Sequence, residues 1–385
     1  TLANTSLEIN YNSELKALLA YQAFKFNKQY GGLRNQANIY LGLRNALQDL
    51  DVRYEIIYPG HTESVRSVVY APRNRWLFSA GSNGRLIRWD RFEGMPEPEV
   101  IIKNKTINSV LALSNDERWL ACGCEGLGIQ VFDLSKPGST PRIFSAHQNR
   151  VRSIAMFNDN RSMLTCGIDN TIYKWDLETG IREVFHELES PAKTIAISGN
   201  GQTVAVATRD GKIFLFAGGG SNSPTELFSE TGNQIWSLAF RSKNNMLISG
   251  DQKGFLRIWS IDNRELVLRT KMHQARIIEI KVDPSQRYLA TCSTDGSVFV
   301  RDLDDTNQPP IEIAKLNGFI YSVEFINRGR NLVVGSTSSK PLVGFPVQME
   351  DLSSFICPNI SRNLSQSEWR NYIGDDVPFE ETCSK

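Results

Sequence analysis

The chain has 385 residues, 41% of them hydrophobic and 22% charged, which is an ordinary composition for a globular protein. Its 43 basic and 42 acidic residues leave a formal charge of +1, so no global field attracts nucleic acid or an anionic membrane. No segment is long and apolar enough to span a membrane and no signal peptide stands at the front, so membrane association is expected only through a segment outside this chain.

Residues 1–51 predict a helical hairpin. Between Ser13 and Tyr30 apolar residues recur mostly at spacings of three and four, which indicates one buried helix face, and two glycines end this helix. A second amphipathic pattern runs from Ile39 to about Leu50. Two interpretations stay open: the hairpin is a cap packed on the next domain, or a linker from a larger upstream protein.

Residues 52–347 show short alternating segments separated by polar turns, which predicts strands. Each group of strands closes on a similar pair of residues: Trp89-Asp90, Phe132-Asp133, Trp175-Asp176, Phe216-Ala217, Trp259-Ser260, Arg301-Asp302 and Phe345-Pro346. The steps between these pairs are 43, 43, 41, 43, 42 and 44 residues. A period this regular predicts a repeat fold.

A strand opening stands 24 or 25 residues before each closing pair. Its first and fourth positions are apolar, its third is usually Ser or Thr, and its second varies widely, as expected where one side chain projects out of the core. The second positions are Arg66, Asn108, Arg152, Lys193, Trp236, Ile278 and Tyr321, and the preceding neighbours add Arg150, Arg276 and Phe319.

Gly60-His61, the turn at Asn83-Gly84 and Trp89-Asp90 resemble the signature of WD-repeat β-propellers. The resemblance covers residues 52–347. It implies an all-β fold, a seven-bladed β-propeller with four strands per blade, carrying the N-terminal helical hairpin and a short helical C-terminal tail. The segment Arg53–Tyr58 precedes the first strand opening, so we expect it to be the outer strand of the last blade.

In that family a His, a Ser or Thr, a turn Asp and a Trp form a hydrogen-bonded tetrad inside a blade. The resemblance implies a complete tetrad at His147, Thr165, Asp169 and Trp175, and a variant at His61, Ser79, Asn83 and Trp89. A third set, His273, Thr291 and Asp295, has Arg301 where the Trp would stand.

The repeat pattern ends after residue 347, and residues 348–385 predict a tail that packs on the propeller. A short helix is expected from Asp351 to Cys357, and a second begins at Ser365, whose spacing to Glu368 matches a capping box. Both ends of the chain resemble the regions that flank propellers in bacterial STAND-type signalling ATPases. Cys357 and Cys383 lie in this tail, where they form a disulfide in an oxidising compartment or remain two free thiols.

The motifs of common enzymes are missing from the sequence: it has no phosphate loop, zinc-binding HExxH helix or nucleophile elbow. Three of the four histidines occupy equivalent repeat positions, which favours a structural role. Cys122 and Cys124 lack further metal ligands nearby and are interpreted as buried hydrophobic residues. The glycines from Gly218 to Gly220 predict a flexible loop between the fourth and fifth blades. We expect no cofactor and no metal.

The resemblance places the varied second positions around the channel rim on one face. Basic and aromatic residues predominate there, which predicts a face that binds a protein partner or peptide; the alternative is a solvated rim that binds nothing. The predicted function is a non-enzymatic interaction module, the scaffold or sensor part of a larger bacterial signalling protein. A subunit of an envelope or secretion assembly and a propeller hydrolase are the alternatives. The compartment stays open between the cytoplasmic and periplasmic faces of a bacterial membrane.

Overall fold

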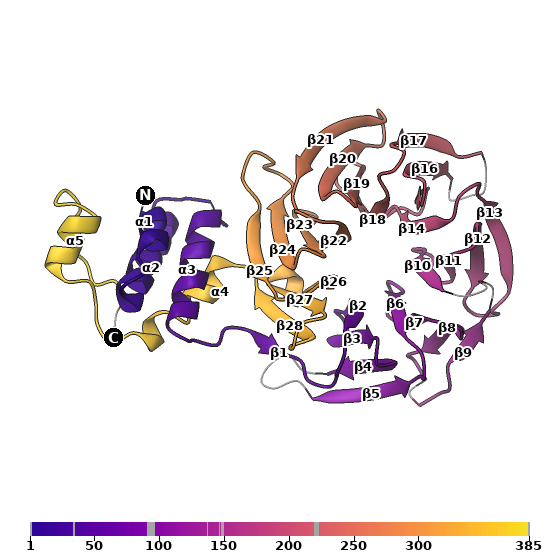
Figure 1. The fold of residues 1–385 in the computed structure, drawn as a ribbon, viewed down its shortest axis with the longest axis horizontal. Coiled ribbons are helices and arrows are strands. Elements are labelled where there is room, and N and C mark those ends of the chain that lie inside the picture. The colour runs from indigo at the N-terminus through magenta and orange to yellow at the C-terminus, as the bar shows by residue number, and fades with distance from the viewer. Residues whose placement is uncertain are drawn as a thin grey trace.

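The structure is a computed structural model that describes residues 2–33, 35–90, 97–136, 138–145, 147, 150–218 and 223–383. Seven four-stranded antiparallel sheets stand around a ring, and helices lie against one side of it (Figure 1). The prediction of a seven-bladed β-propeller is confirmed. The predicted glycine loop lies outside the described residues, except for Gly218.

The blades are numbered along the chain, with the strands of each in order from the channel outward. Blade 1 contains β2 (Val65–Ala71), β3 (Trp76–Gly81), β4 (Arg85–Trp89) and β5 (Pro98–Lys103). Blade 2 contains β6 (Asn108–Leu113), β7 (Trp119–Cys124), β8 (Gly128–Asp133) and β9 (Arg142–Phe144). Blade 3 contains β10 (Val151–Met156), β11 (Ser162–Gly167), β12 (Thr171–Asp176) and β13 (Arg182–Glu187). Blade 4 contains β14 (Ala192–Ile197), β15 (Thr203–Thr208), β16 (Lys212–Ala217) and β17 (Thr225–Ser229). Blade 5 contains β18 (Ile235–Arg241), β19 (Met246–Asp251), β20 (Phe255–Ser260) and β21 (Glu265–Lys271). Blade 6 contains β22 (Ile277–Val282), β23 (Tyr288–Ser293), β24 (Ser297–Asp302) and β25 (Ile311–Lys315). Blade 7 contains β26 (Ile320–Ile326), β27 (Asn331–Ser336), β28 (Leu342–Pro346) and β1 (Ile56–Ile57).

Both ends of the propeller segment meet in blade 7. Strand β1 pairs with β28, with Ile56 opposite Gly344 and Ile57 opposite Val343. The prediction for the segment Arg53–Tyr58 is confirmed. Because the first strand of the segment completes the last blade, the ring closes by backbone hydrogen bonds rather than by side-chain packing alone.

The Ser that recurs at the third position of the strand openings joins neighbouring blades. Ser67 Oγ accepts a hydrogen bond from the backbone N of Leu111 at 3.0 Å, and Ser322 Oγ accepts one from Val68 N at 3.0 Å. Ser153 and Ser237 accept equivalent bonds from the next blade. These hydroxyls pair backbone donors that lie beside the register shifts of the first strands, where a buried N–H would otherwise be unpaired.

The N-terminal unit has three helices, α1 (Leu2–Glu8), α2 (Ser13–Gln29) and α3 (Ala37–Asp49). The sequence analysis predicted only the last two, because seven residues are too few to show a helical period. Asn12 caps α2, since its side chain accepts a hydrogen bond from Leu15 N at 2.9 Å.

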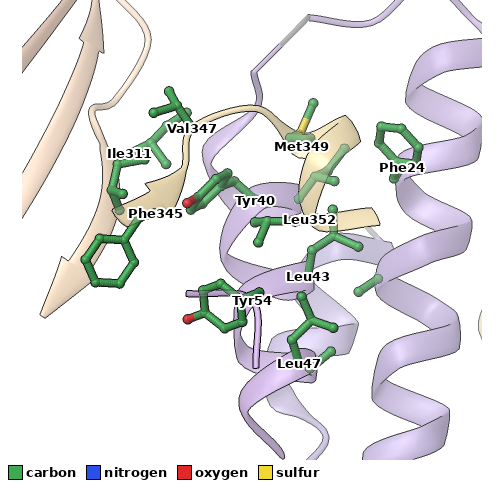
Figure 2. Close-up of a cluster of buried hydrophobic side chains, with 14 of the residues drawn as sticks. Phe24, Tyr40, Leu43, Leu47, Tyr54, Ile311, Phe345, Val347, Met349 and Leu352 are labelled. Carbon is green, nitrogen blue, oxygen red and sulfur yellow. The ribbon is translucent and has the colours of Figure 1, made fainter. Parts of the chain in front are cut away.

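The helices share one continuous hydrophobic core with blades 6 and 7. Figure 2 shows Tyr40 of α3 beside Phe345 of the propeller, and Leu43 and Leu47 on the side of α3 nearer to α2. The buried hydroxyl of Tyr40 donates to the backbone O of Pro346 at 2.7 Å. The described part of the chain contains no helix long and apolar enough to cross a membrane.

The C-terminal tail contains α4 (Met349–Ser353), the 3-10 turn η2 (Cys357–Asn359) and α5 (Gln366–Tyr372). The first helix begins two residues earlier than predicted and ends four earlier, so Pro358 lies in the following turn rather than at the helix end. The capping box is confirmed, because the Ser365 side chain accepts from Glu368 N and the Glu368 side chain accepts from Ser365 N.

The far end of the tail lies against the helices. Trp369 packs edge-on against Phe26 with ring centroids 6.2 Å apart, and Gln22 Nε2 donates to Glu380 Oε1 at 2.6 Å. A disulfide joins Cys357 to Cys383. The two chain ends therefore form one body beside the ring (Figure 1).

Candidate functional site

A register shift at the start of every first strand positions the candidate binding face. In blade 1, Val65 pairs with Gly81 and Ser67 with Ala80, so Arg66 is an extra residue without a partner on the neighbouring strand. The same shift leaves Arg152, Lys193, Trp236, Ile278 and Tyr321 unpaired in blades 3 to 7. Such bulges redirect a side chain away from the sheet.

Blade 2 differs from the prediction by one residue. Its shift lies between Asn108 and Val110, so Ser109 is the bulged residue and Asn108 pairs with Cys124 inside the sheet. Asn108 is fully buried, and its Nδ2 donates to the backbone O of Gly84 at 2.9 Å. Asn108 therefore does not belong to the face. A shift of one residue exchanges the two sides of a strand, and here the polar Asn occupies the inward position.

The bulged residues line a cavity of about 880 Å³ at the centre of the ring, bounded by first strands of all seven blades. Nine of the ten predicted face residues lie in its wall: Arg66, Arg150, Arg152, Lys193, Trp236, Arg276, Ile278, Phe319 and Tyr321. We call the part of the cavity formed by these nine residues the channel mouth.

Positive charge concentrates on one side of the channel mouth. Lys193 Nζ lies 3.5 Å from the ring centroid of Trp236, and the Arg276 guanidinium lies 4.7 Å from the same centroid, so two cations share one indole. Within the described residues no ion pair is recorded for Arg152, Lys193, Arg209 or Arg276. Arg150 is paired, with its Nε 3.1 Å from Glu125 Oε1.

The crowding of cations changes the pKa of Lys193. Burial and the neighbouring guanidinium groups of Arg152, Arg209, Arg276 and Arg150 lower the pKa of Lys193 to about 8. Burial and the charge of Arg150 also lower the pKa of Arg152. In both cases burial is the largest cause of the lowered pKa, and the neighbouring cations add to it.

Charge is balanced deeper in the channel. Lys281 Nζ lies 3.0 Å from Glu324 Oε2 and 3.8 Å from Glu279 Oε1. Although burial opposes the charge of Lys281, these two carboxylates raise its pKa overall. The unpaired cations are therefore a property of the mouth and not of the whole channel wall.

The opposite side of the channel mouth is aromatic. The Arg66 guanidinium lies 4.0 Å from the ring centroid of Tyr321, and its Nε donates to Ser82 Oγ at 2.7 Å. Phe319 contacts Tyr321 edge-on at 6.5 Å and remains 51% exposed. The mouth thus presents a cationic half from blades 3 to 6 beside an aromatic half from blades 7 and 1.

The sequence analysis missed Arg209. It follows β15 directly and acts on the charge of Lys193, and residues at the same place in other blades contact residues of the mouth: Ser82 bonds Arg66, and Glu125 pairs with Arg150. These positions repeat with the period of the blades. In addition to the strand openings, the residue that follows each second strand could therefore have been used to predict residues near the mouth.

The structure brings both implied tetrads together. His147 lies 2.9 Å from Thr165 Oγ1 through Nε2 and 2.9 Å from Asp169 through Nδ1, and Trp175 Nε1 donates to Thr165 Oγ1 at 2.9 Å. These side chains lie inside blade 3. The polar members are paired with one another, so the set stabilises the blade rather than offering groups to a ligand.

The variant set is connected less completely. His61 lies 2.6 Å from Ser79 Oγ and 3.1 Å from Asn83 Oδ1, but Trp89 Nε1 finds no hydrogen-bond partner in the described structure. Burial lowers the pKa of His61 to about 4, so its imidazole is neutral at pH 7. In blade 6, His273 Nε2 lies 2.8 Å from Thr291, and the side chain of Arg301 donates instead to Thr306 O.

The described residues contain no group of three or more His, Cys, Asp or Glu side chains that could hold a metal ion. Cys122 and Cys124 are fully buried in β7 with sulfurs 3.8 Å apart. His186 lies in β13 against the ring of Phe216.

Comparison with known proteins identifies the repeats. Residues 53–90, 138–176, 223–260 and 264–302 match the family described as WD domain, G-beta repeat. The matched segments end on the closing pairs of blades 1, 3, 5 and 6. These four segments of the seven-bladed propeller therefore match WD40 repeats.

Relatives are found among eukaryotic propeller proteins. The Schizosaccharomyces pombe protein named Target of rapamycin complex subunit wat1 is 25% identical over 247 residues, covering 62% of this chain and 78% of the relative. The Saccharomyces cerevisiae Target of rapamycin complex subunit LST8 is 25% identical, covering 60% of this chain and 77% of the relative. A rice guanine nucleotide-binding protein subunit beta is 24% identical over 65% of this chain and 58% of its own length.

The crystal structure of the WD40 β-propeller domain of Doa1 is similar in fold, with a TM-score of 0.66 at 17% identity over 77% of this chain and 98% of that domain. The resemblance of both chain ends to bacterial STAND-type ATPases is not shown by these comparisons.

Proposed function

We propose that the chain is a non-enzymatic interaction module that binds an acidic segment of a protein partner at the channel mouth. One observation carries the proposal: Arg152, Lys193 and Arg276 converge on one cavity with no recorded ion pair among the described residues. A buried or half-buried cation without a counter-charge is costly, so the site favours a partner that brings negative charge.

The composition of the mouth supports a protein partner. Trp, Tyr and Arg are the residue types that dominate the energies of protein interfaces, and Trp236, Tyr321 and Arg152 meet in this cavity. The related proteins are named as subunits of complexes, which fits a scaffold role in an assembly.

The first experiment compares partner capture by the intact chain and by its Trp236→Ala and Arg152→Ala variants, using extract of the native host and mass spectrometry. We expect both substitutions to remove the same bound partner, with affinity falling roughly tenfold or more per residue at a hot spot. Arg370→Ala is the matched control, because Arg370 is 68% exposed on the tail and its ion pair among the described residues is with Asp375. Unchanged capture by both mouth variants would overturn the proposal.

A finer placement is also proposed, as the scaffold or sensor part of a larger bacterial signalling protein of the STAND type. It rests on the resemblance of both chain ends, and on the packing of α1 to α3 with the tail as one body beside blades 6 and 7. The test is mass spectrometry of the native polypeptide recovered from the host in the same experiment. Peptides from an ATPase covalently attached to this chain would support the placement. Their absence, together with recovery inside an envelope or secretion complex, favours the alternative role in such an assembly.

A further inference from the structure

Resting on the proposed function, we infer that the cationic half of the channel mouth is a binding site for a phosphoryl group on a phosphorylated protein segment. Arg152 comes from blade 3, Lys193 from blade 4 and Arg276 from blade 6, so the three cations reach the cavity from different directions. Arg209, in the turn after β15, adds a fourth cation close to Lys193.

The number and arrangement of the cations decide between a carboxylate and a phosphoryl group. A carboxylate carries one charge and two oxygens in a plane, whereas a phosphate monoester carries almost two charges and three free oxygens in a tetrahedral arrangement. One carboxylate leaves most of this charge unbalanced. A phosphoryl group presents one oxygen to each of three cations that approach from separate blades, and planar guanidinium groups match it well.

The surroundings favour a peptide over a membrane headgroup. Lys193 and Arg152 are only partly exposed inside a cavity, and Lys193 stacks on the indole of Trp236. Phe319 and Tyr321 line the other side of the same cavity. A chain that carries a phosphorylated residue and an apolar neighbour occupies both halves, whereas a flat bilayer surface does not enter a recessed ring.

The charge on Lys193 supplies a signature that a merely structural lysine would not show. With its pKa near 8, Lys193 loses its proton as the pH rises above that value, and the surrounding arginines keep theirs. A phosphate monoester loses its second charge below pH of about 6. Binding of a phosphorylated peptide is therefore strongest between these limits and weakens on both sides.

The experiment uses the whole chain and three peptide libraries with degenerate flanks, whose central residue is phosphoserine, serine or glutamate. We expect the phosphoserine library to bind roughly tenfold more tightly than the glutamate library, from the second charge and the additional acceptor oxygens. Lys193→Ala should remove this preference, and Lys193→Arg should keep binding strong above pH 9, where the parent protein weakens. Lys136→Ala is the control, since Lys136 is 70% exposed between β8 and β9.

Each remaining outcome decides against the inference. Equal binding of the glutamate and phosphoserine libraries would identify a carboxylate site and leave the proposed function intact. Lys193-dependent binding to vesicles containing phosphatidylinositol 4-phosphate, with no peptide binding, would identify a lipid headgroup. Failure of all three libraries, while Trp236→Ala still releases the captured partner, would remove the phosphoryl site alone. Thermal unfolding of each variant shows that the fold is retained.

Discussion

The inside of the blades and the channel mouth treat charge in opposite ways. In blade 5, Asp251 is fully buried, yet its carboxylate meets Arg257 Nη1 at 2.6 Å and Asn233 Nδ2 at 2.8 Å, and it accepts from the backbone N of Lys253 and Phe255. At the mouth, Lys193 is accessible and surrounded by cations of its own sign.

This contrast separates groups that stabilise the fold from groups that are available to a partner. A fully paired polar network lowers the energy of the folded chain and leaves no unpaired hydrogen-bonding or charged group for a ligand. Unpaired cations raise the energy of the folded chain and gain most when an anion arrives. Residue type alone does not distinguish the two, because arginine and aspartate occur in both.

The largest expected effect is at Asp251. Substitution Asp251→Ala leaves the buried Arg257 with one ion-pair partner among the described residues, the partly exposed Glu230, whose Oε2 lies 2.8 Å from Arg257 Nη2. We expect the free energy of unfolding to fall by about 3 kcal/mol, measured by urea denaturation. Asp375→Ala is the control, because Asp375 is 81% exposed beside Arg370, and it should change stability by less than about 0.5 kcal/mol. Equal effects of the two substitutions would contradict the description of blade 5.

The tetrads give a smaller effect that differs between two blades. Thr165→Val removes the partner of both His147 and Trp175, and we expect a loss of about 2 kcal/mol. Ser79→Ala removes only the bond to His61, so about 1 kcal/mol is expected.

Thr165→Val replaces the hydroxyl with a methyl group and Ser79→Ala deletes it, so the difference between the two losses reports chiefly on the bond from the Trp indole. Thermal unfolding of the two variants side by side provides the measurement. A larger loss at Ser79 than at Thr165 would show that Trp89 finds a bond to Ser79 in solution.

The repeat period was sufficient to predict the blades. The closing pairs recur every 41 to 44 residues, and seven of them correctly give seven blades. The same period indicates the correct position of Asn108. Asn108 stands 24 residues before Phe132, and in most openings the residue at this spacing is the first one. Ile107, at the spacing of 25, is apolar like the first residue of the other openings, and this favoured the wrong register.

Other features could not be predicted from the sequence. Helix α1 is too short to show a period, and its packing depends on α2 and α3. The crowding around Lys193 joins side chains from Arg150 to Arg276, which only the closure of the ring brings together. A sequence shows that basic residues are present, but the balance of charge at one point depends on the distances between blades.

The smallest expected effect tests that balance directly through the pH dependence of stability. The pKa of Lys193 is about 8 in the folded chain and about 10.5 when unfolded, so between these values the unfolded chain binds more protons. The free energy of unfolding contributed by this group therefore rises as pH increases from 8 to 10.5, by on the order of 1 kcal/mol after screening by solvent.

Lys193→Gln removes the titration and leaves the other ionising groups in place, so the quantity to follow is the difference in stability between the parent and this variant. Urea denaturation at pH 7, 9 and 10 should show the parent gaining relative to Lys193→Gln. The gain should shrink in 1 M salt, where the Debye length falls to about 3 Å and the arginines no longer repel the lysine strongly. A difference that stays constant with pH would mean that neither burial nor the neighbouring cations lower the pKa of Lys193, and it would contradict this description of the mouth.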